Sequence, residues 1–279
     1  MQLQTKASFR KEYLAFFRTK KFIILTLVII GVSILNPLML AGLGFLMDSL
    51  SGFYNEVGMD ISILSDMLSS SVSTGVAQSV MDIAQTGLIV FLLVINSNAG
   101  GEQKKRSIMI PRSSGLRSFG YIFPKFIIYP LTAFVLAVVA AFASWGSSMM
   151  AFRNNDVTPV EVLLAGVLVG VCLMFYVCAH ITIGTSTGKA GLSAAVCIVA
   201  SLLLPSLFTL FGSEIAYNPF TLNVLAGTVV HSNGISAFQA IEAAITVVIT
   251  LAIMIILFFL ALFVQNAKKI DNSGNEIRI

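Results

Sequence analysis

Long apolar runs separated by short polar stretches constrain this chain more than any other feature. A helix that crosses a bilayer needs about 20 mostly apolar residues. Six segments meet this requirement: residues 22–47, 74–94, 121–149, 160–183, 191–211 and 238–264. Lipid offers backbone groups no hydrogen-bond partner, and these runs lack the alternation of strands, so each is predicted to be a helix. The sequence therefore predicts an all-α, polytopic membrane protein.

Composition supports the same class. Hydrophobic residues make up 57% of the chain and charged residues 11%, whereas soluble domains carry about 25% charged residues. No polar stretch between the runs is long enough to bury a core of its own, so residues 1–279 are expected to form a single transmembrane domain. The first run is longer than the apolar region of about 7 to 15 residues in a secretory signal, which predicts a retained span.

The distribution of charge predicts the orientation. If the N-terminus is inside, the inner side receives nearly every Lys and Arg, in residues 6–21, 104–125, 189 and 268–278, and Arg153 alone lies outside. Acids such as Asp48, Glu56 and Glu214 fall at the opposite face. By the positive-inside rule, both termini are expected to be cytoplasmic. Because the cations gather at span ends, the lipid bilayer is the expected partner and nucleic acid is not.

Residues 1–21 are predicted to form a helix lying in the inner membrane interface, with rings buried and cations near anionic headgroups. The rings at helical spacing on one side are Phe9, Tyr13, Phe16 and Phe17, and the cations elsewhere include Arg10, Lys11 and Arg18. The alternative is a simple orientation signal. On the outer side, the acidic, Ser-rich residues 49–73 are predicted to contain a short surface helix.

The loop between the second and third runs, residues 95–120, combines two kinds of residue. Its cations are Lys104, Lys105 and Arg106, and its apolar triplet is Ile108, Met109 and Ile110. A solvated, positive-inside loop would explain the cations but not an apolar triplet placed between two arginines. The triplet is predicted to fit a socket on a soluble partner, and the cations to steer the encounter.

Taken together, these features resemble the membrane subunit of a type-2 ABC transporter. The matching positions are Arg10, Lys11, Glu12 and Arg18 before the first span, and Glu102, Lys104, Lys105, Arg106, Pro111 and Lys125 around the loop. The resemblance implies an N-terminal elbow helix and a coupling loop that docks on a separate cytoplasmic ATPase. The short stretch from Glu102 to Pro111 departs from the family pattern, which often includes a Gly-Thr pair.

The resemblance has further implications. A second copy of the chain, or a related permease, would complete the transport path. The substrate would be an amphipathic molecule such as a peptide, lipid or drug, exported from a bacterial cell. Residues 212–237, which contain YNPFTLNVLAG, would form a re-entrant segment near the outer exit.

The chain is not expected to be an enzyme. Its closest match to a phosphate-binding loop is GTSTGK at residues 184–189, where Ile183 and Ala190 break the pattern at two positions. ATP and Mg²⁺ are therefore expected on the partner subunit, and no cofactor on this chain. His180 and the three cysteines lack the spacing of metal ligands, and no catalytic or metal site is predicted.

Polar residues inside the spans are candidates for a substrate path. They are Gln78, Asp82 and Gln85 on one face of the second run, and Gln239, Glu242 and Thr246 on one face of the last. An acid at mid-membrane costs about 2.5 to 3.5 kcal/mol on insertion scales, so these faces should point to the bundle or to water. Interhelical hydrogen bonding is the alternative.

Two other functions remain open at this stage. One is an ion-coupled secondary transporter that uses Asp82 or Glu242, although no convincing internal repeat is visible. The other is a non-transporting immunity or scaffold protein of the membrane, which would not require the apolar triplet.

Overall fold

The computed structural model describes residues 2–57, 71–101, 117–152, 156–210, 217–231, 237–270 and 276–278. It contains six helices that are long and apolar enough to cross a membrane, as predicted: Lys21–Leu46, Val72–Ala99, Ser118–Ala151, Pro159–Thr187, Ala190–Phe208 and Ala240–Ala267. Their ends agree with the predicted ends to within five residues. The candidate coupling residues from Glu102 to Pro111 lie outside the described residues.

Helix α9 (Pro159–Thr187) is the most buried of the six spans. Helices α8 (Ser118–Ala151), α10 (Ala190–Leu210), α11 (Leu222–His231) and α12 (Ala237–Ala267) all pack against it. Gly166 and Gly170 let α8 approach closely: a Cβ at Gly166 would lie 3.1 Å from the Cβ of Ala141. Two glycines four positions apart thus allow close packing between two helices of the same chain.

Local sequence signals fix both ends of α9. The Thr158 side chain accepts a hydrogen bond from the Glu161 backbone N–H, and the Glu161 carboxylate accepts one from the Thr158 N–H at 2.8 Å. This capping box satisfies two backbone donors, and Pro159 suits the first helical position. Gly188 ends the helix with a φ of 70°, a left-handed conformation that glycine adopts without strain.

Span 2 is one continuous path built from four pieces. These are α4 (Val72–Asp82), η1 (Ile83–Gly87), α5 (Leu88–Asn96) and η2 (Ser97–Gly101). Both η1 and η2 are π-helical turns, a geometry that is rare in helices and frequent at functional sites. Because residues 95–101 and 118–120 are helical, the segment available for a loop is shorter than the predicted 95–120.

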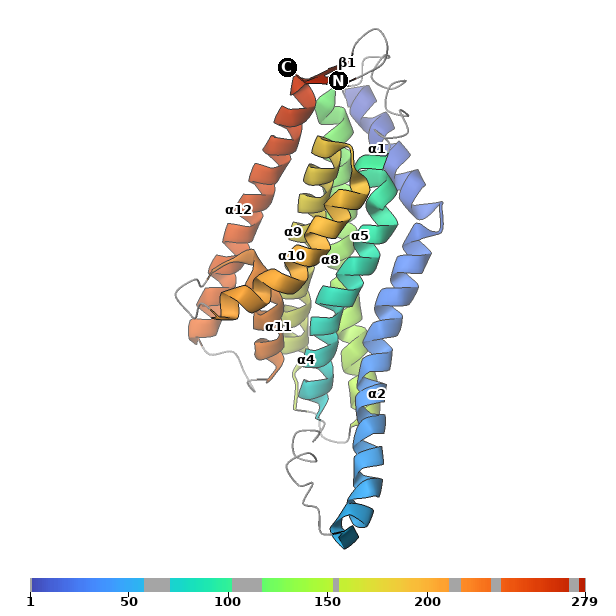
Figure 1. Ribbon diagram of the computed structural model, residues 1–279, viewed down its shortest axis with the longest axis vertical. Coiled ribbons are helices and arrows are strands. Elements are labelled where there is room, and N and C mark those ends of the chain that lie inside the picture. The colour runs from blue at the N-terminus through green and yellow to red at the C-terminus, as the bar shows by residue number, and fades with distance from the viewer. Residues whose placement is uncertain are drawn as a thin grey trace.

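Helix α2 (Lys21–Val57) is 37 residues long and continues beyond the neighbouring helices (Figure 1). Residues 49–57 therefore prolong span 1, whereas residues 58–70, the central part of the segment 49–73 that was predicted to contain a short surface helix, lie outside the described residues. The short elements are α1 (Gln2–Phe17), the 3-10 turn η4 (Pro219–Thr221) and the antiparallel strands β1 (Lys268–Ile270) and β2 (Glu276–Arg278). Apart from this short C-terminal hairpin, the elements of the described residues are helical, which confirms the all-α prediction.

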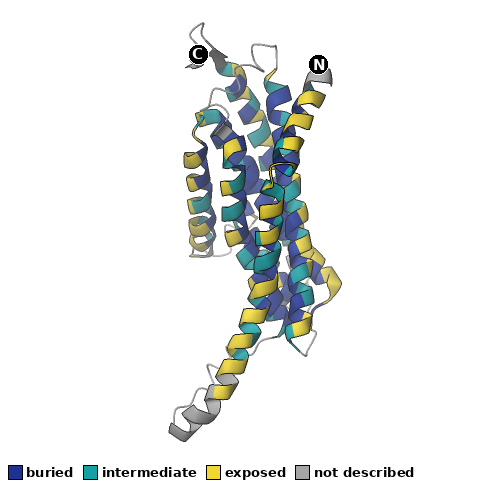
Figure 2. Cartoon of the chain, turned by 90° about the vertical axis from the view of Figure 1, so that its right-hand side faces the viewer, coloured by how far each residue is buried: buried dark blue, intermediate teal, exposed yellow. Residues whose placement is uncertain are grey.

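Much of the outer surface of the bundle is apolar, as a surrounding bilayer requires. Exposed side chains on α2 and α12 include Leu27, Leu35, Ile256 and Phe259. Figure 2 shows exposed positions recurring along the helices. The two termini lie at the same end of the bundle (Figure 1), which an even number of spans demands. This shared end is called the terminal end below.

Candidate functional site

A buried ion pair joins α1 to α8 at the terminal end. Lys125 Nζ lies 2.9 Å from Glu12 Oε1, and the side chains are 0% and 1% exposed. The family resemblance named both residues separately, Glu12 in the elbow and Lys125 near the loop. The structure brings them together and places Lys125 inside α8, not in the loop. Opposite charges removed from water in this way need further hydrogen bonds to be stable.

Two neighbouring residues supply those hydrogen bonds. The Tyr129 hydroxyl donates to Glu12 Oε2 at 2.6 Å and accepts from Asn98 Nδ2 at 2.5 Å. Lys125 Nζ also donates to the Asn98 backbone carbonyl at 2.6 Å. Asn98 belongs to η2, so the turn that ends span 2 is tied to both α1 and α8.

Lys21, the first residue of α2, completes the cluster. Its Nζ donates to Ser97 Oγ at 2.7 Å and to Asn98 Oδ1 at 2.6 Å. Glu12, Lys21, Asn98, Lys125 and Tyr129 are called the terminal polar cluster from here on. It connects α1, α2, η2 and α8, and η2 and α8 are the elements that border residues 102–116 in the chain.

Aromatic packing covers one side of this cluster. Phe16 is fully buried and meets Tyr129 edge to face, with ring centroids 5.3 Å apart. Phe17 is half-buried, whereas Phe9 and Tyr13 are exposed. Among the charged elbow candidates, Arg10, Lys11 and Arg18 are exposed and Glu12 is buried. The predicted aromatic face is therefore shared between the bundle and the surroundings.

Helix α1 runs along the first turns of α8, so Glu12 faces Lys125 and Phe16 faces Tyr129. In both views α1 rises obliquely from the start of α2 toward the terminal end (Figures 1 and 2). Its exposed rings and cations remain available to a membrane interface. That placement in the interface stays a prediction.

A second polar cluster lies in the middle of span 2. Asp82 is half-buried, and its carboxylate accepts hydrogen bonds from Asn36 Nδ2 at 2.7 Å and from Gln78 Nε2 at 3.2 Å. Gln78, Gln85 and Thr86 are exposed. The π-helical turn η1 begins at the residue after Asp82. A polar, exposed strip at this depth requires water or another molecule, because lipid would leave its groups unpaired.

The polar face predicted on the last span lies elsewhere. Thr246 is buried and donates to the Glu242 backbone carbonyl at 2.8 Å, and Glu242 is half-buried. The side chain of Gln239 lies outside the described residues. Helix α12 packs against α8, α9 and α11, whereas α4 packs against α2, α8, α9 and α11. Among the described residues the two helices thus share α8, α9 and α11 as neighbours.

Within the described residues, no group of three His, Cys, Asp or Glu could hold a metal ion. Cys172, Cys178 and Cys197 are free and buried. The Nδ1 atom of His180 lies 2.7 Å from Ser193 Oγ. This hydrogen bond links α9 to α10, in keeping with the packing role predicted for His180.

Three residues of these sites were not singled out from the sequence for their roles: Asn36, Asn98 and Tyr129. Asn36 adjoins Pro37 and reads as a bend, and Asn98 precedes two glycines and reads as a loop signal. Tyr129 lies inside an apolar run. The only signal that could have marked Asn98 is the repeated asparagine, Asn96 and Asn98, near the end of the second span.

No family model, curated protein or solved structure matches this chain.

Proposed function

We propose that this chain is the membrane-spanning subunit of an ATP-driven transporter of the type-2 ABC class, and that it exports an amphipathic substrate. Two such chains, or this chain and a related permease, would enclose the path. A separate cytoplasmic ATPase would bind ATP and Mg²⁺ and dock on residues 102–116. The terminal end of the bundle would face the cytoplasm, as the charge distribution favours.

The observation that carries this proposal is the terminal polar cluster. A motor that acts on the 102–116 segment needs a stiff connection from that segment to the spans. Buried, fully hydrogen-bonded networks are rigid because each bond is strengthened by the low local dielectric. The cluster joins the residues on both sides of the segment, Asn98 and Lys125, to α1 and α2. Displacement of the segment would then move spans 1, 2 and 3 together.

Helix α11 fits the same proposal. With η4 it forms a short apolar helical stretch, Pro219–Val230, that is too short to cross a bilayer. It packs against α9 and α4 at the end of the bundle away from the termini (Figure 1). A re-entrant segment near an outer exit would have this length and position.

The docking of the ATPase can be tested by copurification. An ATPase subunit encoded beside this chain would be coexpressed with the tagged chain and recovered with it. Replacing Ile108→Asp and Ile110→Asp should lower the recovered ATPase at least tenfold, because charged side chains cannot fill an apolar socket. The matched control is Ser113→Asp with Ser114→Asp, which adds the same charge to the same segment. Equal recovery with both double variants would contradict the proposal.

The energy source separates this proposal from an ion-coupled transporter, which the half-buried Asp82 would otherwise suit. Transport in cells should persist when a protonophore collapses the ion gradient and ATP is maintained. Transport that stops under these conditions would instead favour an ion-coupled role for Asp82 or Glu242.

A further inference from the structure

The exposed strip of α4 is flanked by two different surroundings. On one side, Asp82 contacts α2 through its hydrogen bond from Asn36. On the other, Met81 contacts α11, where a Cβ added to Gly227 would collide with the Met81 side chain. Gln78 and Gln85 lie between these two sides and are exposed. A molecule resting on the strip would touch a carboxylate at one edge and an apolar thioether at the other.

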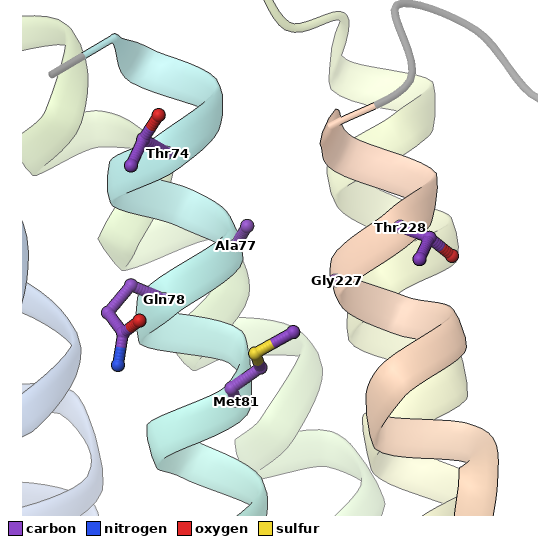
Figure 3. Close-up of a pocket in the computed structure, with 6 residues that line it drawn as sticks. All are labelled: Thr74, Ala77, Gln78, Met81, Gly227 and Thr228. Carbon is purple, nitrogen blue, oxygen red and sulfur yellow. The ribbon is translucent and has the colours of Figure 1, made fainter. Parts of the chain in front are cut away.

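A groove opens along the second edge, between α4 and α11 (Figure 3). Its volume is about 260 Å³, and it is lined by Thr74, Ala77, Gln78, Met81, Gly227 and Thr228. Figure 3 shows Met81 pointing toward α11 and Gln78 pointing away from it. Gly227 lets the Met81 side chain lie against α11 because it carries no Cβ, and a methionine adapts its shape readily to different apolar occupants.

The acid of the strip has defined partners. Asn36 and Gln78 donate N–H groups to the Asp82 carboxylate, and these bonds stabilise its charge against the partial burial that opposes it. Among the described residues no Lys or Arg forms an ion pair with Asp82, so a cation supplied by a bound molecule would complete the pairing. A second copy of this chain placed symmetrically on the strip would instead bring two Asp82 carboxylates toward each other. Charge complementarity thus favours a cationic ligand over a self-contact.

We propose that the α4–α11 groove and Asp82 together bind the transported substrate, and that this substrate is an organic cation with an apolar body. The inference rests on the proposed transport function and names its substrate class. The apolar body would occupy the groove beside Met81 and Gly227, and the positive charge would lie against Asp82, one helical turn from Gln78.

Binding can be measured on the full chain alone, in nanodiscs of neutral lipid. The probes are tetraphenylphosphonium and tetraphenylborate, which share a shape and differ in the sign of their charge. Protein-free nanodiscs give the background, which is needed because bilayers themselves distinguish these two ions. Wild-type protein should bind the phosphonium above background and prefer it to the borate. Absence of that preference would overturn the inference without any variant.

Two variants locate the site. Asp82→Asn keeps the shape of the side chain and should lower phosphonium affinity at least tenfold while leaving borate binding unchanged. Gly227→Leu would displace the Met81 side chain that lies against Gly227, which changes the lining of the groove, and should lower the affinity for any ion that binds there. The matched control is Glu161→Gln, a buried acid in the capping box of α9, where glutamine also serves, and this variant should bind like wild type. An equal loss in Glu161→Gln, or wild-type affinity in Asp82→Asn, would refute the assignment.

The outcome is independent of the motor. No ATPase or nucleotide is present in the binding assay, so a failed copurification would tell against the proposed function and leave this site standing. If a Gln85→Cys variant instead forms disulfide-linked dimers across the strip and binds no phosphonium, a second copy of the chain occupies the strip and the inference is wrong.

Discussion

The ion pair between Glu12 and Lys125 is the side-chain contact on which the terminal polar cluster depends. Replacing Lys125→Met would leave the Glu12 carboxylate buried without its cation, and such losses cost about 3 to 5 kcal/mol. The double variant Glu12→Gln with Lys125→Met should recover much of this, because no buried charge remains. Thermal unfolding of the purified chain in detergent measures both effects.

Lys11 provides the control for this prediction. Its Nζ lies 3.9 Å from Glu12 Oε1, but its side chain is 49% exposed. Exposed pairs contribute about 0 to 1 kcal/mol, so Lys11→Met should unfold close to the wild-type temperature. If Lys125→Met is no less stable than Lys11→Met, the buried pair does not hold α1 on α8.

Asp156 offers a pH-dependent contact at the opposite end of the bundle. Burial raises the pKa of its carboxyl. Hydrogen bonds from the Ser73 hydroxyl at 2.6 Å and from the Ser73 backbone N–H at 3.0 Å lower this pKa and outweigh burial, so the net pKa is below the ordinary 3.8. A depressed pKa contributes stability above the unfolded-state value, and this contribution disappears as pH falls through the folded-state value.

The expected effect of Asp156→Asn is therefore a lower melting temperature at pH 7, by about 2 °C for an exposed contact of at most 1 kcal/mol. The difference from wild type should shrink as the pH is lowered from 5 to 3. Melting curves across that range test the sign: a gap that widens toward acid pH would exclude the proposed role of the carboxylate.

At the level of elements, the π-helical turn η1 makes a distinctive prediction. A π turn holds one residue more than an α turn, so deleting the exposed Thr86 should convert η1 to α-helix and keep both halves of span 2 in register. The hydrogen bonds from Asn36 to Asp82 and from Asn98 to Tyr129 would both be retained. We expect the deleted chain to fold, with a loss of stability of about 1 to 2 kcal/mol.

The matched deletion is Val135, an exposed residue within α8, which is one continuous α-helix. Removing one residue there rotates the two halves of α8 by about 100° relative to each other, because an α-helix has 3.6 residues per turn. This chain should fail to yield a monodisperse protein in size-exclusion chromatography. Equal behaviour of the two deletions would mean that η1 does not absorb a residue.

Much of the element structure could be predicted because membrane spans depend on composition over a long window, which the sequence shows directly. The turns IAQTG and SNAGG at η1 and η2 could not be predicted, since a π turn is a compromise between packing on either side and has no periodicity of its own. The continuation of α2 past residue 49 was hidden by its serines, glycine and asparagine, which normally indicate loops.

The candidate sites were predictable only in part for a similar reason. Glu12 and Lys125 were named from separate segments, but their contact depends on how α1 packs against α8, which no local pattern specifies. Asp82 was identified because an acid inside a span is unusual. Its partner Asn36 was not, because the sequence does not show which face of α2 meets α4.

At the level of the whole molecule, the orientation can be mapped by cysteine labelling. The native thiols Cys172, Cys178 and Cys197 are buried, so an impermeant maleimide should give a low background on intact cells. Lys189→Cys, in the exposed turn after α9, should be labelled only when the cells are opened, whereas Tyr217→Cys, exposed before η4, should be labelled from outside. Labelling of Lys189→Cys from outside, and of Tyr217→Cys only in opened cells, would contradict the proposed orientation.

The length of α2 has a consequence for access to the face opposite the termini. Its first 26 residues match the span, and the remaining stretch to Val57 adds about 16 Å at 1.5 Å per residue. A helix that projects this far beyond its span would keep a large surface, such as an apposed membrane or a large globular protein, from lying flat against that face.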